Sequence, residues 1–219
     1  MADTAEPFVP ARAGIRSLAK AAAGCRGCEL YQDATQTVFG AGPIRTRAMF
    51  VGETPGDIED REGVPFVGPA GRLLDRALAE AGIDRDEVYL TNAVKHFRWR
   101  PAPRGKRRLH QTPDAHHVAA CRPWLVAELA LVRPPVLVAL GAVAAKALFG
   151  SAFRLTQHRG QRLAWPPERG PYAGDDTPVE AAFATVHPSA VLRAEDRGDA
   201  FTKLVHDLGM VARSMREES

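Results

Sequence analysis

The residues of this chain that could bind a metal most directly are its three cysteines. Cys25 and Cys28 are separated by two residues, and Cys121 lies far along the chain. Three cysteines cannot pair completely as disulfides, and the C-x-x-C spacing favours a metal site or a redox dithiol. We therefore expect reduced thiols and a reducing compartment.

A second candidate is the run GKRRLH at positions 105–110, where three consecutive cations precede a leucine and a histidine. The run lacks the apolar periodicity of a helix or strand, so we expect a basic loop over residues 104–111. A basic run can serve solubility alone. Because the net charge of the whole chain is only +3, it is the clustering of arginines from Arg98 to Arg108 that favours an anionic partner.

Apolar runs that alternate with helical periodicity indicate the elements that must position these residues. Strands are predicted at 47–51, 88–94, 135–140 and 181–186, and helices at 14–23, 69–81, 112–132, 142–148 and 201–215. Thr112 is the predicted cap of the third helix and Pro113 its first residue. Such strands are buried on both faces, which predicts an α/β fold with a parallel sheet covered by helices.

Polar residues follow the predicted strands where each one ends. Ligands and catalytic groups of parallel α/β sheets gather at the carboxyl ends of the strands. We therefore expect a common site built from Gly52, Glu53, Asn92, Gly141 and His187.

Length and composition predict one domain over residues 1–219, with 45% hydrophobic residues to form its core. Residues 1–12 are expected to be flexible, and residues 166–178 to form a surface loop. The most apolar stretch, 134–149, is interrupted by Gly141 and Lys146 before it could span a bilayer. We expect a soluble, cytoplasmic monomer that does not bind membranes.

Six motifs occur in an order that resembles the uracil-DNA glycosylase superfamily, in its iron-sulfur (family 4-like) branch and, within that branch, the UdgX type. They are GETPGDIED at 52–60, GVPFVGPAGRLLDRAL at 63–78, VYLTNAVKHF at 88–97, GKRRLH at 105–110, ACRPWL at 120–125 and TVHPSAVLR at 185–193. The resemblance runs from about Cys25 to the last helix. It implies a three-layer α/β/α sandwich around a four-stranded parallel sheet.

The resemblance also implies a metal centre. Cys25, Cys28 and Cys121 match three cysteine ligands of a [4Fe-4S] cluster, and His96 stands where conventional members have the remaining cysteine. A histidine can replace a thiolate on a cluster iron. The same four residues would equally suit a Cys3His zinc site, and a free buried cysteine beside a surface histidine is the plainest alternative.

For the base, the resemblance implies that Phe66 stacks on uracil and that the Asn92 carboxamide pairs with its N3–H and O4, in a pocket shared with Gly52 and Thr54. An asparagine fixed by its neighbours rejects cytosine, which presents the opposite donor pattern. A core phenylalanine and a turn-capping asparagine are the plain alternatives. The UdgX type usually has glutamine where this chain has Thr54, so any contact made by that amide is in doubt.

For the reaction, the resemblance implies that His187 hydrogen-bonds the uracil O2 as negative charge collects on the departing base. His110 then attacks C1' in place of water, since a neutral imidazole is a good nucleophile near pH 7. Glu53 accepts a proton from that imidazole, holds its tautomer or stabilises the cationic sugar. Asp57 and Asp60 either orient Glu53 or the loop, or are solvated.

The expected partner is uracil-containing DNA, mainly single-stranded, and five residues are expected near its phosphates: Lys106, Arg107, Arg108, Ser189 and Arg193. The preferred reading is a protein that excises uracil and stays bonded through His110 to the abasic sugar. A conventional glycosylase that releases the abasic site and a non-catalytic DNA-binding module are the alternatives.

Overall fold

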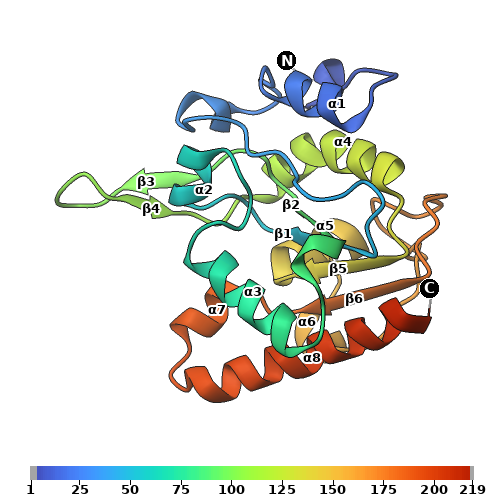
Figure 1. The fold of residues 1–219 in the computed structure, drawn as a ribbon. Helices are drawn as coiled ribbons and strands as arrows, with labels where there is room; N and C mark the ends of the chain where they lie inside the picture. The colour runs from blue at the N-terminus through green and yellow to red at the C-terminus, as the bar shows by residue number, and fades with distance from the viewer. Residues whose placement is uncertain (1–3, 218–219) are drawn as a thin grey trace.

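The computed structural model describes residues 4–217 as a four-stranded sheet with helices on both faces (Figure 1). The strands are β1 (Ala48–Gly52), β2 (Val88–Asn92), β5 (Val136–Leu140) and β6 (Ala181–Thr185). They pair in the order β2-β1-β5-β6, and every pair is parallel. The predicted α/β sandwich with a four-stranded parallel sheet is therefore confirmed.

Each strand is fully buried along its length because both faces of the sheet are covered. On one face the core residues Phe50, Leu90, Val138 and Phe183 pack with α3 (Pro69–Glu80), α7 (Pro188–Arg193) and α8 (Arg197–Glu217). On the other face, alternate residues of the strands pack with α4 (Ala115–Val132) and α5 (Ala142–Phe149). This two-sided burial is the physical basis of the continuous apolar runs.

A third cluster joins α1 (Ile15–Ala22) to α4 and contains all three cysteines. The remaining elements are short: η1 (Glu6–Phe8), η2 (Glu29–Gln32), α2 (Asp57–Glu62), η3 (Arg85–Glu87), β3 (Trp99–Pro101), β4 (Arg108–His110) and α6 (Leu155–His158). Within residues 4–217, no helix has the length and apolar character needed to cross a membrane.

The expectation of a basic loop over 104–111 is wrong for its second half. Residues Arg108–His110 form β4, which pairs antiparallel with β3 and places His110 opposite Trp99. The two strands make a hairpin that projects from the body of the molecule (Figure 1). Because its strands do not cover the main core, their sequence lacks the apolar pattern that predicts a strand.

Two smaller expectations are also corrected. Asp114, not Thr112, caps α4: its side chain accepts from the backbone of His117, and the His117 side chain accepts from the backbone of Asp114. The N-terminal segment is anchored at Ala5, which is buried and donates its backbone N–H to the Ala120 carbonyl at 2.7 Å. Residues 1–3 of the segment expected to be flexible lie outside the described part of the chain.

Candidate active site and metal centre

The carboxyl ends of the strands bring four of the expected site residues together. Gly52 ends β1 opposite Asn92, which ends β2. A Cβ atom on Gly52 would lie 2.4 Å from Asn92 Oδ1 and 2.6 Å from Phe66 Cζ. The ring centroids of Phe66 and His187 are 6.0 Å apart. The glycine is therefore required for the carboxamide and the phenyl ring to share one space.

Phe66 is held in this space by an unusual backbone conformation. Its φ of 58° is in the left-handed region that non-glycine residues seldom adopt. The loop is fixed by Glu59, a buried carboxylate that accepts the Gly68 N–H at 2.8 Å. Sequence reasoning missed Glu59 because it lies among three other acidic residues of the 57–62 segment that look equally solvated.

His187 is a neutral hydrogen-bond donor in this arrangement. The Ser189 backbone N–H donates to His187 Nδ1 at 3.2 Å, so Nδ1 holds a lone pair and Nε2 carries the proton. Burial lowers the pKa of His187 to about 4, and the nearby His110 and Arg193 act in the same direction. The expected phosphate contact Ser189 therefore has a role inside the protein, because its hydroxyl also lies 2.8 Å from Nδ1.

Glu53 provides a basic carboxylate next to these groups. Burial raises its pKa, although a hydrogen bond from Thr112 and the charge of Arg193 oppose the shift. Its Oε1 atom is buried and has no hydrogen-bond partner among residues 4–217. A buried carboxylate oxygen without a partner is free to accept a proton or to face a cation.

His110 lies at the end of β4 with its ring near Phe97, at a centroid distance of 6.0 Å. The protein lowers its pKa: partial burial contributes most, the charge of Arg193 adds to it, and Glu59 opposes it. Arg193 is exposed but shifts the pKa of Glu53, His110 and His187 alike. The pKa values of Glu53, His110 and His187 are consequently all coupled to the charge of Arg193.

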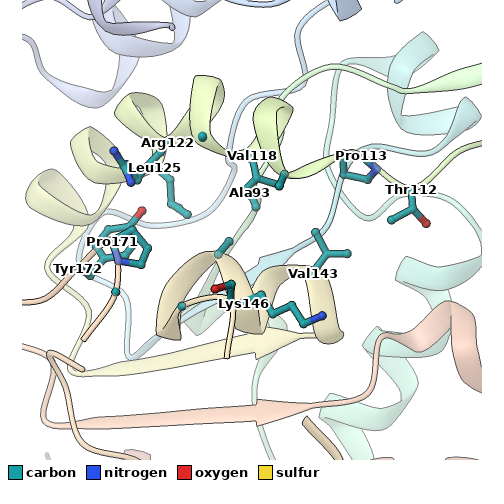
Figure 2. Close-up of a pocket in the computed structure, with 16 residues that line it drawn as sticks. Ala93, Thr112, Pro113, Val118, Arg122, Leu125, Val143, Lys146, Pro171 and Tyr172 are labelled. Carbon is teal, nitrogen blue, oxygen red and sulfur yellow. The ribbon is translucent and has the colours of Figure 1, made fainter. Parts of the chain in front are cut away.

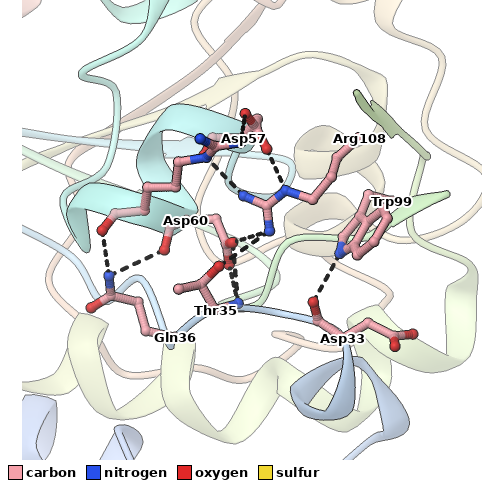
Figure 3. A network of polar contacts seen from close by, with 8 residues as sticks. Asp33, Thr35, Gln36, Asp57, Asp60, Trp99 and Arg108 are labelled. Atoms are coloured by element: carbon pink, nitrogen blue, oxygen red, sulfur yellow. Dashed lines mark hydrogen bonds and ion pairs between the residues drawn. The ribbon is translucent and has the colours of Figure 1, made fainter. Parts of the chain in front are cut away.

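Arg108 anchors the hairpin that carries His110 (Figure 3). Its Nε donates to Asp57 Oδ1, and its Nη1 lies 2.7 Å from Asp60 Oδ2 and 3.1 Å from Thr35 Oγ1. The side chain of Arg108 is only 13% exposed, and its guanidinium also lies 5.4 Å from the Trp99 ring centroid. The expectation of Arg108 at the phosphates is therefore corrected, because its donors are committed to carboxylates.

The other two cations of the run, Lys106 and Arg107, are exposed at the tip of the hairpin. Asp57 and Asp60 are thus found to orient the hairpin.

Thr54 is buried and donates its hydroxyl to the His96 carbonyl at 2.8 Å. Its donor is directed at the segment that contains His96, which leaves only the hydroxyl lone pairs for any other contact.

The three thiols are buried, and two of them accept hydrogen bonds from N–H groups. Cys25 Sγ accepts from Trp124 Nε1 at 3.2 Å, and Cys121 Sγ accepts from the backbone of Lys95 at 3.3 Å. Burial raises the pKa of the Cys121 thiol to about 12, and the proximity of Cys25 and Cys28 contributes to the rise. Hydrogen bonds from N–H groups stabilise thiolates. Because burial raises the thiol pKa, a nearby cation would also be needed to favour the thiolate form.

His96 is oriented by Thr37. The Thr37 hydroxyl donates its single proton to the Ala22 carbonyl at 2.9 Å, so it can only accept from His96 Nε2, which is also at 2.9 Å. The proton is therefore on Nε2, and Nδ1 keeps a lone pair available to a metal. Burial lowers the pKa of His96 to about 4, which keeps the ring neutral as a ligand requires.

Another histidine cluster, Glu29, His116 and His117, has ligand atoms close enough to hold an ion. His117 Nδ1 accepts the Asp114 backbone N–H at 3.0 Å, so its Nε2 is protonated and donates to Glu29 Oε1 at 2.8 Å. A protonated nitrogen does not bind a metal. We therefore interpret this cluster as a connection between η2 and the start of α4.

A buried ion pair lies behind the site. Lys95 and Glu128 have side chains that are 1% and 0% exposed, and their Nζ and Oε2 atoms are in contact. Lys95 Nζ also donates to the Asn92 carbonyl at 2.7 Å, and Thr91 and Tyr89 donate to Glu128. The sequence offered no signal for Glu128, which is one acid within an otherwise apolar helix.

Comparisons with known proteins agree with this geometry. The family model described as the uracil DNA glycosylase superfamily matches residues 39–209. A type-4 uracil-DNA glycosylase of Thermotoga maritima is 38% identical over 170 residues, 77% of this chain and 78% of that protein. The type-4 uracil-DNA glycosylase of Pyrobaculum aerophilum is 37% identical over 186 residues, which cover 85% of this chain and 87% of that protein. The type-4 uracil-DNA glycosylase of Sulfurisphaera tokodaii is 36% identical over 173 residues, which cover 77% of this chain and 71% of that protein.

The matched region contains every strand of the sheet and every residue of the candidate active site. On this evidence the chain belongs to the uracil DNA glycosylase superfamily.

Proposed function

We propose that this protein excises uracil from DNA, preferably single-stranded DNA, and that His110 becomes covalently bonded to the abasic sugar. Membership of the superfamily supports the excision. The observation that carries the covalent step is the anchoring of Arg108 to Asp57 and Asp60, which fixes the strand that ends in His110. A histidine that served only as a phosphate contact would need no such fixation.

In the first half of the proposed reaction, uracil lies against Phe66 with its N3–H and O4 toward Asn92. The bond between C1' and N1 breaks, and its electron pair leaves with the base. His187 Nε2–H donates to O2 as this charge develops, which is where a donor gives the most rate. The neutral state of His187 makes it a donor that does not need to lose its proton.

In the second half, the lone pair of the His110 imidazole forms a bond to C1'. The alkylated ring is cationic until it loses its remaining N–H proton, and we assign the acceptance of that proton to Glu53. The lowered pKa of His110 keeps its lone pair available, and the raised pKa of Glu53 makes it the better base. Water does not readily cleave a bond between an imidazole nitrogen and this carbon, so we expect the protein to act once.

We also propose that Cys25, Cys28, His96 and Cys121 hold a [4Fe-4S] cluster. The three cysteines are buried together in the cluster of residues that joins α1 to α4, and His96 keeps a neutral ring. The sequence resembles the iron-sulfur branch, and the relatives are type-4 uracil-DNA glycosylases, so we favour a cluster over zinc. Such a cluster would fasten α1 and the base of the hairpin to the domain.

The experiment for the reaction uses an oligonucleotide with one deoxyuridine, incubated with the protein and run on a denaturing gel. We expect a protein–DNA band that survives boiling, and its absence in His110→Gly, with Gln111→Ala as the matched control. Free abasic strand without the band would support a conventional turnover glycosylase instead. Equal binding of uracil and thymine strands without excision would support a non-catalytic module.

The experiment for the metal is the absorption spectrum of the purified protein together with its iron and zinc content. A broad visible absorption with about four irons per chain supports the cluster. A colourless protein with one zinc per chain would contradict it.

A further inference from the structure

A large groove lies beside the candidate active site, between α4 and α5, and no step proposed above uses it (Figure 2). Its volume is about 610 Å³, within the range of about 300–1,000 Å³ that is typical of ligand sites. Val118 and Leu125 of α4 line one side, and Val143 and Lys146 of α5 line the other. Most of the lining is therefore aliphatic.

One end of the groove reaches the active site. Thr112 lines that end and donates a hydrogen bond to Glu53. Ala93, which follows Asn92, is also in the lining, and Val143 comes two residues after Gly141. A Cβ on Gly141 would be 2.9 Å from His187 Cβ, so this part of α5 begins at the site itself.

The other end is closed by the loop that contains Gly170, Pro171 and Tyr172. This loop is held closely against the end of α5: a Cβ on Gly170 would lie 3.2 Å from the Gly150 Cα, and both glycines have positive φ. A side chain at Gly170 would require its neighbour to shift slightly, and a side chain at either position would adopt a strained backbone conformation. The far wall of the groove is consequently preformed.

Two cations face this apolar groove without ion-pair partners. Lys146 and Arg122 are exposed, and neither forms an ion pair in the described part of the chain. The Tyr172 ring also belongs to the lining, but its hydroxyl is buried behind the wall. The charges that the groove offers to a ligand are therefore positive.

We propose that this groove binds the nucleotides on one side of the uracil, with Lys146 and Arg122 at their phosphates. The inference rests on the proposed function, because a strand whose uracil occupies the site must leave it along some surface. This groove begins where the flipped nucleotide would lie, offers aliphatic walls to bases and carries cations free for phosphates. An acidic peptide would suit the cations, but nothing connects it with the active-site end.

The test measures the affinity of single-stranded oligonucleotides that carry a 2'-fluoro-deoxyuridine, whose glycosidic bond resists cleavage. The shortest has one nucleotide on each side of the uracil, and two others add four nucleotides on the 5' side or on the 3' side alone. We expect one of the two extensions, and not the other, to increase affinity at least about tenfold, because only the nucleotides on one side of the uracil would reach the apolar walls and the two cations of the groove.

The groove variants are Lys146→Gln and Arg122→Gln, and the control is Arg213→Ala on α8, across the sheet. In Lys146→Gln we expect most of the length-dependent gain to disappear and the slope of log K against log salt to fall by about 0.7 for the lost phosphate contact. Arg122→Gln should change the gain and the slope in the same direction. Arg213→Ala should match the unmodified protein.

The proposal is overturned if neither extension increases affinity or if all the groove variants keep the full gain. Either result would place the strand elsewhere and leave the groove for another partner. Failure of the proposed function is read separately, from excision and adduct formation on the same strands with ordinary deoxyuridine. A protein that shows the gain but forms no adduct would keep the groove proposal and contradict the covalent one.

Discussion

Arg108 Nη1 lies 2.7 Å from Oδ2 of Asp60, a carboxylate whose side chain has no exposed surface. Two residues later the chain reaches His110, so the position of this imidazole depends on an ion pair whose carboxylate is shielded from water. Asp60 also accepts the Thr35 backbone N–H at 3.0 Å. The carboxylate therefore joins the hairpin to the segment before β1 as well as to α2.

The first prediction concerns this carboxylate. Asp60→Asn leaves the Arg108 guanidinium largely buried with a weaker partner, and breaking such a pair costs about 3–5 kcal/mol. We expect the single-turnover rate of adduct formation to fall at least about tenfold, and the melting temperature to fall too. Glu62→Gln, at an exposed position of the same helix, is the control. An unchanged rate in Asp60→Asn would mean that the hairpin is held by other contacts.

The second prediction concerns pH. In the proposed reaction His110 must be neutral and Glu53 must be ionised, so acidification should stop the reaction by protonating either group. Because the pKa of His110 lies below 6.5 and that of Glu53 above 4.5, the rate should be constant at neutral pH and fall only below the range of an ordinary histidine.

Arg193 offers a way to separate the two groups. In Arg193→Gln the pKa of both His110 and Glu53 should rise, because the arginine charge now lowers both. The pH below which the single-turnover rate falls should therefore move upward. The rate is measured with excess protein so that DNA binding is complete. NMR titration of the His110 ring would measure the same shift directly. A pH dependence that stays in place contradicts the electrostatic link.

The third prediction concerns the buried pair behind Asn92. Glu128→Gln leaves the Lys95 ammonium inside the protein without a full counter-charge, so the free energy of unfolding should fall by about 3–5 kcal/mol. Urea unfolding measures the loss, and Glu80→Gln, on the surface of α3, is the control. In Lys95→Met/Glu128→Leu, which buries no charge, part of the loss should be recovered.

The fourth prediction concerns Thr37. Thr37→Val removes the acceptor that holds the proton of His96 on Nε2, and such outer contacts change metal affinity by about 10–100-fold. We expect faster loss of metal to a chelator, followed by absorbance and by metal content of the desalted protein. Thr202→Val, a surface substitution on α8, is the control. Equal rates of loss would show that His96 needs no such support.

Much of the fold could be predicted from the sequence because its strands are buried on both faces and helices such as α1 and α3 have one apolar face. The hairpin could not, since β3 and β4 carry charged residues and cover no main core. The short helices α2 and α7 have six residues each, too few to show a period.

Within the site, the groups at strand ends could be predicted because parallel strands end at a common edge. The partners of these groups could not. Asp60, Glu59 and Thr37 act through contacts with residues that are distant in the chain or on an adjoining loop, and their types are equally common in solvated turns. Arg108 shows the same limit: a cation in a basic run looks available to DNA until the carboxylates facing it are known.

The absence of a side chain at Gly52 has a practical consequence. A single methyl group there would meet Asn92 and Phe66 while leaving every acid, imidazole and thiol of the protein unaltered. Gly52→Ala should thus prevent uracil from occupying the pocket without changing the groups proposed to react with it. The variant would provide an inactive control protein for experiments in which His110 itself must stay intact.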